Sequence, residues 1–259
     1  MRVMCYNIMN GGALGRPRGA VMTEVIREQD PDVLGLCECE HFRPEEGDGL
    51  ALLCRELGMR GIVNTAPSGN HVAILYKPNL QPAAVSTKSV GMYNGQVRVE
   101  LRSNTICSYA IVMTHLHPFS PTLRLGEAEM VSVRAAHAPQ SIIMGDLNCL
   151  APQDVTASTL AALSRTFRLR VTNSSGSADT GPIDLLCSRG YTDLGARARQ
   201  CTYPTDLRDA QEGSSERGRL DYMLASARLA AACTSFQCID TVQAHQASDH
   251  LPLVADLDV

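Results

Sequence analysis

The chain has 259 residues, of which 44% are hydrophobic, and its formal net charge is −4. A chain of this length and composition can bury a substantial core, which indicates a soluble globular protein. The net negative charge excludes attraction of nucleic acid by the surface as a whole, so any contact with a polyanion has to be local. The apolar runs are far shorter than the roughly 18 residues that a spanning helix needs, so we predict no membrane span.

The N-terminus and the cysteines bear on the cellular compartment. Met1-Arg2 leads directly into a strand-like run, without the order of basic, apolar and small residues that marks a signal peptide, so we predict an intracellular, cytoplasmic protein. We expect the cysteines to be buried, reduced thiols rather than disulfides or ligands of a structural zinc. Those within or beside apolar runs are Cys5, Cys37, Cys107, Cys149 and Cys187. No obligate protein partner is evident from the sequence.

Short β-rich runs alternate with helix-like stretches, which predicts a mixed α/β fold. In chain order, the expected strands are Val3–Ile8, Val33–Cys37, Val72–Tyr76, Ile106–Met113, Ser141–Met144, Leu220–Leu224 and Leu251–Leu257. The expected helices are Ala20–Gln29, Gly49–Leu57 with Gly58 as its C-cap, Leu123–Ala136 and Thr156–Ser164. Two stretches rich in Ser, Gly and acidic residues, 172–182 and 206–218, are predicted to be long loops that shape substrate access. Neither has the character of a domain linker, so we predict one domain over residues 1–259.

Six segments share one pattern, in which an apolar, strand-like run ends in or contains isolated polar groups. Together they supply Asn7, Glu38, His115, Asp146, Asn148, Asp221, Asp249 and His250. Because burial of an unpaired carboxylate costs several kcal/mol, these groups must face solvent, bind a cation or pair with one another. Taken singly, each also fits a structural role: Asn7 could cap a turn, Glu38 could end a strand in water, and His115 could be a hydrogen-bonded core histidine.

Taken in this order, the segments resemble the endonuclease/exonuclease/phosphatase superfamily, which includes deoxyribonuclease I and exonuclease III-type abasic-site endonucleases. The resemblance extends from Asn7 to Pro252. Its motifs are Asn7, Glu38, Thr114-His115-Leu116, Gly145-Asp146-Leu147-Asn148, the Asp221 of Arg219-Leu220-Asp221-Tyr222, and Ser248-Asp249-His250. It implies a four-layer α/β sandwich of two packed mixed β-sheets flanked by helices, and a metal-dependent enzyme that hydrolyses phosphate esters.

The resemblance also implies a metal site. Glu38, Asn7 and Asp249 would hold Mg²⁺, for which Mn²⁺ could substitute, because hard oxygen ligands suit both cations. Asp249 could instead orient its neighbour, and either one or two metal ions could be used. In one departure from the family pattern, Cys37 stands where Gln often precedes the metal-binding Glu.

The remaining motif residues would act on the phosphate. Asp146 would orient and deprotonate the attacking water, and Asn148 would hold that water or a phosphate oxygen. His250, polarised by Asp221, would stabilise developing charge. His115 would lie on the opposite side of the phosphate, as a second stabiliser or a proton donor to the leaving oxygen.

Two observations bear on the substrate. The run Arg219-Leu220-Asp221-Tyr222 resembles abasic-site nucleases more than the W-C-D-R strand of inositol polyphosphate 5-phosphatases. The chain has no Trp and only 4% aromatic residues, which leaves few platforms for stacking bases. We predict a nuclease acting on DNA or RNA; the alternatives are a phosphatase or a lipid or small-molecule phosphodiesterase of the same fold, and a catalytically silent binding module.

Three further residues are candidates for substrate contact. His117 shares a strand face with His115, so it could extend the site toward the leaving group or could face solvent. His71 precedes an expected strand, and it too could contact the substrate or face solvent. Arg124, at the start of an expected helix, could contact a phosphate, as could Arg217 or Arg219.

Overall fold

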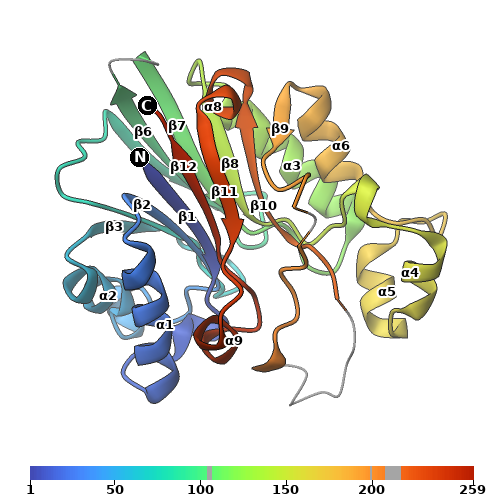
Figure 1. Ribbon diagram of the computed structural model, residues 1–259, viewed down its shortest axis with the longest axis horizontal. Helices are drawn as coiled ribbons and strands as arrows, with labels where there is room; N and C mark the ends of the chain where they lie inside the picture. Colours follow the sequence, from blue (N-terminus) through green and yellow to red (C-terminus); the bar gives the residue numbers. More distant parts are fainter. Residues whose placement is uncertain (104–106, 199, 208–216) are drawn as a thin grey trace.

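The computed structural model describes residues 1–103, 107–198, 200–207 and 217–259, and it consists of two mixed six-stranded sheets flanked by helices (Figure 1). Sheet A has the order β11 (Cys233–Cys238), β12 (Leu253–Leu257), β1 (Arg2–Asn7), β2 (Val33–Cys37), β4 (Ala73–Tyr76) and β3 (Arg60–Val63). Sheet B has the order β5 (Ala84–Lys88), β6 (Gln96–Ser103), β7 (Cys107–Thr114), β8 (Ser141–Asp146), β10 (Asp221–Ser226) and β9 (Tyr191–Asp193). The predicted four-layer sandwich is confirmed.

Alternation of side chains along the strands builds the layers of the core. In β1, Val3 and Cys5 point into the cluster between the two sheets, whereas Met4 and Tyr6 point to the opposite face of sheet A. Successive side chains of a strand point to opposite faces, so a strand whose residues are all apolar is buried on both sides. This explains why β1 and β2 are continuous apolar runs rather than alternating ones.

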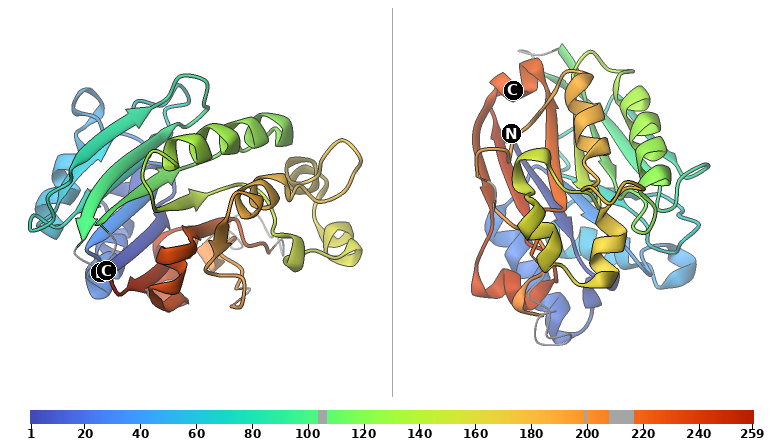
Figure 2. Two further views of the ribbon diagram at one scale, coloured as in Figure 1. Left: turned by 90° about the horizontal axis from the view of Figure 1, so that it is seen from above. Right: turned by 90° about the vertical axis from the view of Figure 1, so that its right-hand side faces the viewer.

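Helices cover the outer faces of both sheets, as the views in Figures 1 and 2 show. The helices that contribute to the cluster on sheet A are α1 (Pro17–Gln29), α2 (Gly49–Leu57) and α9 (Val242–Ala247). Those that cover sheet B are α3 (Pro121–Ala135) and α6 (Gly181–Ser188). After β8 the chain forms α4 (Ala157–Ala162) and α5 (Arg165–Val171), and α8 (Ala227–Ala231) connects β10 to β11. Among the described helices, none is long and apolar enough to cross a lipid bilayer.

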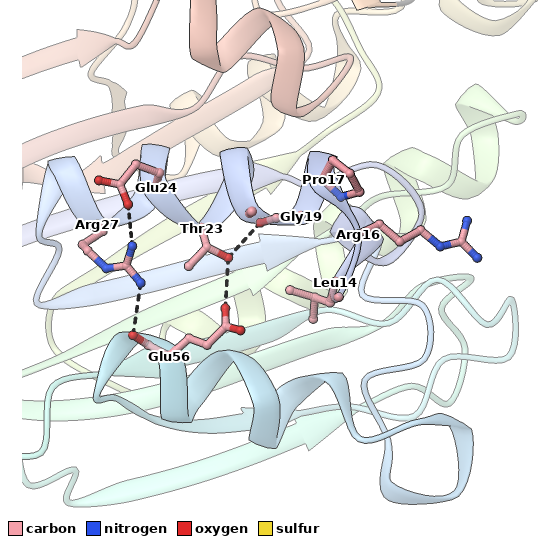
Figure 3. A pocket seen from close by; sticks show the side chains of 10 residues that line it. Leu14, Arg16, Pro17, Gly19, Thr23, Glu24, Arg27 and Glu56 are labelled. Carbon is pink, nitrogen blue, oxygen red and sulfur yellow. Dashed lines mark hydrogen bonds and ion pairs between the residues drawn. The ribbon is translucent and has the colours of Figure 1, made fainter.

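Polar contacts join α1 to α2 around a surface pocket (Figure 3). The Thr23 hydroxyl donates to the Gly19 carbonyl at 2.9 Å and lies 3.3 Å from Glu56 Oε2. Arg27 pairs with Glu24 and donates to the Glu56 carbonyl oxygen at 3.4 Å. These contacts hold the two helices together on the outer face of sheet A.

The strands expected from the sequence are all present, and their bounds differ from the expected ones by at most two residues, apart from Ile106, which lies outside the described residues. Five strands were missed, namely β3, β5, β6, β9 and β11. These strands are short, lie at or near sheet edges, or alternate with polar residues, as β6 does in QVRVELRS. The missed helices are α5, α6, α8 and α9.

Two smaller expectations need correction. The predicted loop 172–182 contains a bridge between Thr172 and Ala178 and the start of α6, and most of the predicted loop 206–218 lies outside the described residues. Cys5, Cys37 and Cys149 are buried free thiols, as expected, but Cys187 is exposed. It is exposed because the buried face of α6 is formed by Ile183 and Leu186.

Gly145 occupies a position in β8 that only glycine fits. Its φ is +143°, and a Cβ atom there would lie 1.7 Å from the backbone oxygen of Thr114 on the neighbouring strand. A side chain would therefore force β7 and β8 apart. His115 and Asp146 directly follow Thr114 and Gly145 in the chain, so their side chains would separate as well.

We expect Gly145→Ala to destabilise the protein by several kcal/mol in urea unfolding, since it adds a backbone clash to backbone strain. Gly190→Ala is the matched control because Gly190 also has a positive φ, +88°, but its Cβ would meet nothing within 4 Å. The control should cost only about 1–2 kcal/mol, the strain of the left-handed backbone. Equal losses in the two variants would contradict this account of Gly145.

Arg124 of α3 is fully buried and connects three segments. Its guanidinium pairs with the buried Asp179, donates to the His117 carbonyl at 2.9 Å and donates to the Arg170 carbonyl at 3.0 Å. Burial raises the pKa of the Asp179 carboxyl, although the Arg124 charge opposes this effect. The pair therefore holds α3, α5 and the segment between α5 and α6 in one arrangement.

Arg124→Met should destabilise the protein by about 3–5 kcal/mol, because it leaves the Asp179 charge buried without its partner. The double variant Arg124→Met/Asp179→Leu should recover part of this loss, since both charges are then removed. Urea unfolding of the two variants checks both statements. A loss below about 1 kcal/mol for Arg124→Met would show that the pair does not hold these segments together.

Candidate active site

Strand register brings the polar strand ends together at one edge of the sandwich. β1 and β2 are parallel, and Asn7 lies opposite Cys37, so Glu38 follows directly beside the end of β1. β8 and β10 are antiparallel, and Asp146 lies opposite Asp221. Directly opposite residues in an antiparallel pair have neighbouring side chains, so the two carboxylates share one site.

The Asp146 carboxylate lies at the centre of this site. Asn7 Nδ2 donates to Asp146 Oδ2 at 3.2 Å and lies 3.3 Å from Glu38 Oε1, so the Asn7 amide joins the two carboxylates. His115 Nε2 lies 3.5 Å from the same Asp146 oxygen. The Asp146 backbone N–H donates to the Cys37 sulfur at 3.4 Å, which gives the thiol a structural role at the family's usual Gln position.

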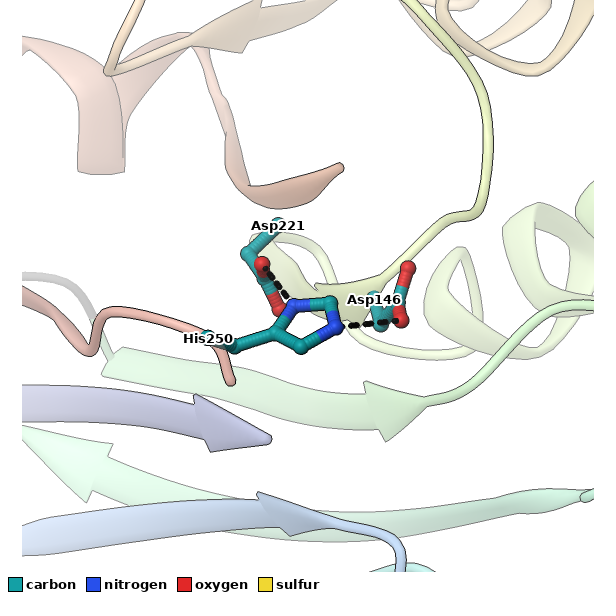
Figure 4. A group of neighbouring side chains, drawn as sticks. All are labelled: Asp146, Asp221 and His250. Atoms are coloured by element: carbon teal, nitrogen blue, oxygen red, sulfur yellow. Dashed lines mark hydrogen bonds and ion pairs between the residues drawn. The ribbon is translucent and has the colours of Figure 1, made fainter. Parts of the chain in front are cut away.

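A His–Asp pair forms the other side of the site (Figure 4). His250 Nδ1 lies 2.7 Å from Asp221 Oδ2, and its Nε2 faces Asp146 Oδ2 at 3.8 Å. Burial alone would lower the pKa of His250, but the Asp221 carboxylate outweighs this effect, and the pKa rises to about 10. The negative charges of Asp146 and Asp249 contribute in the same direction. The neighbouring carboxylates therefore favour the protonated imidazole.

Asn148 is fixed by the turn that follows β8. Its backbone N–H donates to Asp146 Oδ1 at 2.8 Å, and its φ is +51°, a conformation that Asn tolerates better than most residues. Its side-chain nitrogen donates to the Leu116 carbonyl at 3.0 Å, and its Oδ1 accepts from Arg170 at 3.2 Å. The spacing of two residues in the Gly-Asp-x-Asn motif thus places both side chains at one turn.

Several residues that support the site were not singled out from the sequence. The Ser248 hydroxyl donates to the Asn7 carbonyl at 2.6 Å and accepts from the His250 N–H, which connects the terminal motif to the end of β1. The Thr202 hydroxyl accepts from the Asp221 N–H at 3.2 Å. The Tyr203 ring lies 4.8 Å from the His250 ring. Only Ser248 carried a signal, as the first residue of the Ser-Asp-His motif.

The donor chemistry of the site fits a divalent cation. The carboxylates of Asp146, Asp221 and Asp249 surround the His250 imidazole, and Glu38 shares the Asn7 amide with Asp146, so carboxylates outnumber the imidazole in the site. Atoms of Asp146, Asp221 and His250 also lie within 4.8 Å of one another, close enough to hold a metal ion. We favour the Glu38 side, because carboxylate oxygens are the hard ligands that Mg²⁺ prefers and Glu38 lies within reach of the same Asn7 amide as Asp146.

The three predicted metal ligands differ in their burial and in the atoms that they present to the site. Glu38 is half-buried, and its carboxylate oxygens lie 3.3 Å from Asn7 Nδ2 and 3.1 Å from the Asn10 backbone nitrogen. Asp249 is buried in the terminal motif. Asn7 presents Nδ2, not oxygen, to the two carboxylates, while its Oδ1 accepts from the Met9 N–H at 3.1 Å. This orientation favours a bridging role for Asn7 over the predicted ligand role.

The three predicted substrate contacts have different environments. His71 is buried, its Nδ1 accepts from the Ala66 N–H at 3.0 Å, and its Nε2 lies 2.9 Å from the Glu46 carboxylate. Arg124 is also buried in internal bonds, so this geometry supports a structural role for both residues instead of substrate contact. His117 is half-buried beside Tyr93 and Phe119, which leaves it within reach of a ligand. Arg219, an alternative phosphate contact, is buried in ion pairs with Asp154 and Asp193.

Comparisons with known proteins agree with this geometry. A family model described as the Endonuclease/Exonuclease/phosphatase family matches residues 4–250. The structure resembles an AP endonuclease from Archaeoglobus fulgidus, with 19% identity, a TM-score of 0.69 and 100% coverage of both chains. It also resembles the 3′ phosphatase NExo from Neisseria bound to a product DNA hairpin, with 18% identity, a TM-score of 0.71 and 100% coverage of both chains.

A third similar structure is an endonuclease/exonuclease/phosphatase family protein from Bacteroides thetaiotaomicron, with 16% identity and a TM-score of 0.65, covering 98% of this chain and 96% of that one. A search of curated proteins found no significant match. At these identities the structural likeness shows the fold, and the family model matches nearly the whole chain. Members of this family are phosphoester hydrolases. The protein thus belongs to the Endonuclease/Exonuclease/phosphatase family.

Proposed function

We propose that this protein is a Mg²⁺-dependent phosphodiesterase that cleaves DNA or RNA. The observation that carries the proposal is the convergence of Asp146, Asn148, His250 and Glu38 at one edge of the sandwich, with Asp146 bonded to donors on both sides. A divalent cation bound on the Glu38 side would neutralise charge on the phosphate, and Mn²⁺ could replace Mg²⁺.

Asp146 is proposed to be the general base. It is the one carboxylate bordered by both Asn7 and Asn148, which fix its two oxygens in separate hydrogen bonds. A water held against Asp146 would lose its proton to this carboxylate as it attacks phosphorus. Asn148, held in turn by Leu116 and Arg170, keeps its amide beside that position.

His250 is proposed to stabilise the charge that develops on the phosphate. Because its pKa is raised to about 10, it remains a charged donor at neutral pH. Its Nε2 is 3.8 Å from Asp146, longer than a hydrogen bond, so that proton remains available to a phosphate oxygen. His115 places its Nε2 3.5 Å from the same Asp146 oxygen, and it would be the second donor.

Two lines of support favour a nucleic acid as the substrate. The structural relatives include one named as an AP endonuclease and one bound to a DNA hairpin. The run Arg219-Leu220-Asp221-Tyr222, which leads into β10, resembles that of nucleases. Small phosphate esters are the alternative substrates of the same site, and a substrate panel distinguishes them.

Asp146→Asn and His250→Ala should each lower turnover by about 10²-fold to 10⁴-fold, the range for a lost general base or a lost charged donor. The measurement is Mg²⁺-dependent hydrolysis of single-stranded, double-stranded and abasic-site DNA, RNA, bis-p-nitrophenyl phosphate and p-nitrophenyl phosphate. Thermal unfolding confirms that each variant is folded. Wild-type rates in both variants would refute the assigned roles, and cleavage of small esters alone would refute the nucleic-acid substrate.

Chelation should abolish hydrolysis, and addition of Mg²⁺ or Mn²⁺ should restore it. Glu38→Gln should raise the Mg²⁺ concentration required for half-maximal activity by tenfold or more, because it removes a charged oxygen ligand. Glu40→Gln is the matched control on the same loop. Full activity in the presence of a chelator, or the same Mg²⁺ requirement for Glu38→Gln as for wild type, would contradict the proposed metal site.

A further inference from the structure

An aromatic cluster and an arginine lie beside the proposed catalytic residues. The rings of Tyr93, His117 and Phe119 meet with centroid distances of 4.7–6.2 Å. Phe119 contacts the other two rings edge-to-face, and its side chain is 61% exposed. It is one of only four Phe in the chain. An exposed aromatic ring that is held by two neighbouring rings can stack on a planar ligand with little loss of conformational entropy.

Arg170 of α5 connects this ring to the catalytic turn. Its guanidinium carbon lies 5.7 Å from the centre of the Phe119 ring, and its Nη2 donates to Asn148 Oδ1 at 3.2 Å. Its Nε donates to the Pro118 carbonyl at 3.1 Å, and its own carbonyl accepts from Arg124. The side chain is therefore fixed at both ends before any ligand binds.

The guanidinium retains capacity for a ligand. An arginine has five N–H donors, and within the described ranges two of these donors on Arg170 have hydrogen-bond partners. The side chain is half-buried, so its remaining donors can be reached from solvent. A planar guanidinium with free donors beside an aromatic ring matches the phosphate and the base of one nucleotide.

We propose that Phe119 and Arg170 form a subsite for one nucleotide next to the scissile phosphate, with the base stacked on Phe119 and its phosphate held by Arg170. Because a base can stack on a protein ring only when it is released from its neighbours, the subsite selects single-stranded or unpaired segments. This inference rests on the proposed function and specifies its substrate. It also gives a reason why the catalytic Asn148 is connected to an arginine of a separate helix.

The first test is binding of a fluorescein-labelled, ten-nucleotide single-stranded DNA with phosphorothioate linkages, measured by fluorescence anisotropy in Ca²⁺. Phe119→Ala should weaken binding by roughly tenfold to a hundredfold, the range for one lost base–aromatic stack. Arg170→Ala should weaken it comparably, and Arg170→Lys should not restore it, because a lysine lacks the planar donors. A matched double-stranded probe should respond less to each change.

Matched controls come from the same helix. Arg168→Ala removes the same charge from an exposed position of α5, and Leu169→Ala truncates a side chain that is 65% exposed. Both should change binding by less than about threefold. Thermal unfolding of all variants separates a lost contact from a lost fold.

The second test compares kcat/KM on the unmodified oligonucleotide with kcat/KM on bis-p-nitrophenyl phosphate, which has neither a base nor a flanking phosphate. In Phe119→Ala the loss on the oligonucleotide should exceed the loss on the ester by tenfold or more, chiefly through KM. If Phe119→Ala and Arg170→Ala bind and cleave the oligonucleotide like the Arg168→Ala control, the subsite is refuted while the nuclease function stands. If wild type hydrolyses only the ester and does not bind the oligonucleotide, both proposals are refuted.

Discussion

The Asp146 carboxylate is the group on which the arrangement of the site depends. It is buried, and a buried carboxylate requires hydrogen-bond donors or a positive charge nearby. The protein supplies these from separate strands: the Asn7 amide from β1, the Asn148 N–H from the turn after β8, and two histidines. Each donor reaches Asp146 only if the register of its strand places the strand end beside the end of β8.

That requirement explains features far from the chemistry. Gly145 has no side chain because β7 must approach β8 closely where His115 and Asp146 meet. Ser248 fixes the terminal loop to the end of β1, which brings His250 over the site. Asp221 and Asp146 lie on either side of the His250 imidazole, so two buried carboxylates and one histidine form a compact unit, and Asn7 joins this unit to Glu38.

The sequence predicted the central strands, which end in the motif residues, better than the contacts among those residues. Motif residues follow continuous apolar runs, and such runs are the strands buried on both faces, so the central strands were found within two residues. The orientation of the Asn7 amide and the tie between Asn148 and Arg170 depend on strand register and on the packing of α5, which local patterns do not encode. The single-domain organisation and the cytoplasmic location stay predictions.

Two of the candidate substrate contacts share one kind of environment in the structure. Arg124 and His71 are polar residues near motif strands, and a polar residue in such a position is often exposed to substrate. Here both are buried and have internal partners, Asp179 and Glu46, that lie far from them in the sequence. Edge strands such as β5 were missed because they are exposed. Ala84–Lys88 is largely exposed and has no apolar run that would indicate a strand.

The most direct test of this account is the position of Mn²⁺ in crystals of the protein, located by anomalous scattering. The account predicts Mn²⁺ bound to a Glu38 carboxylate oxygen, with the hydrogen bond between His250 and Asp221 intact and with Asp146 still joined to Asn7. Mn²⁺ held between Asp146, Asp221 and His250 would contradict it, because His250 would then be a neutral ligand and Asp146 would no longer be free to accept a proton from water.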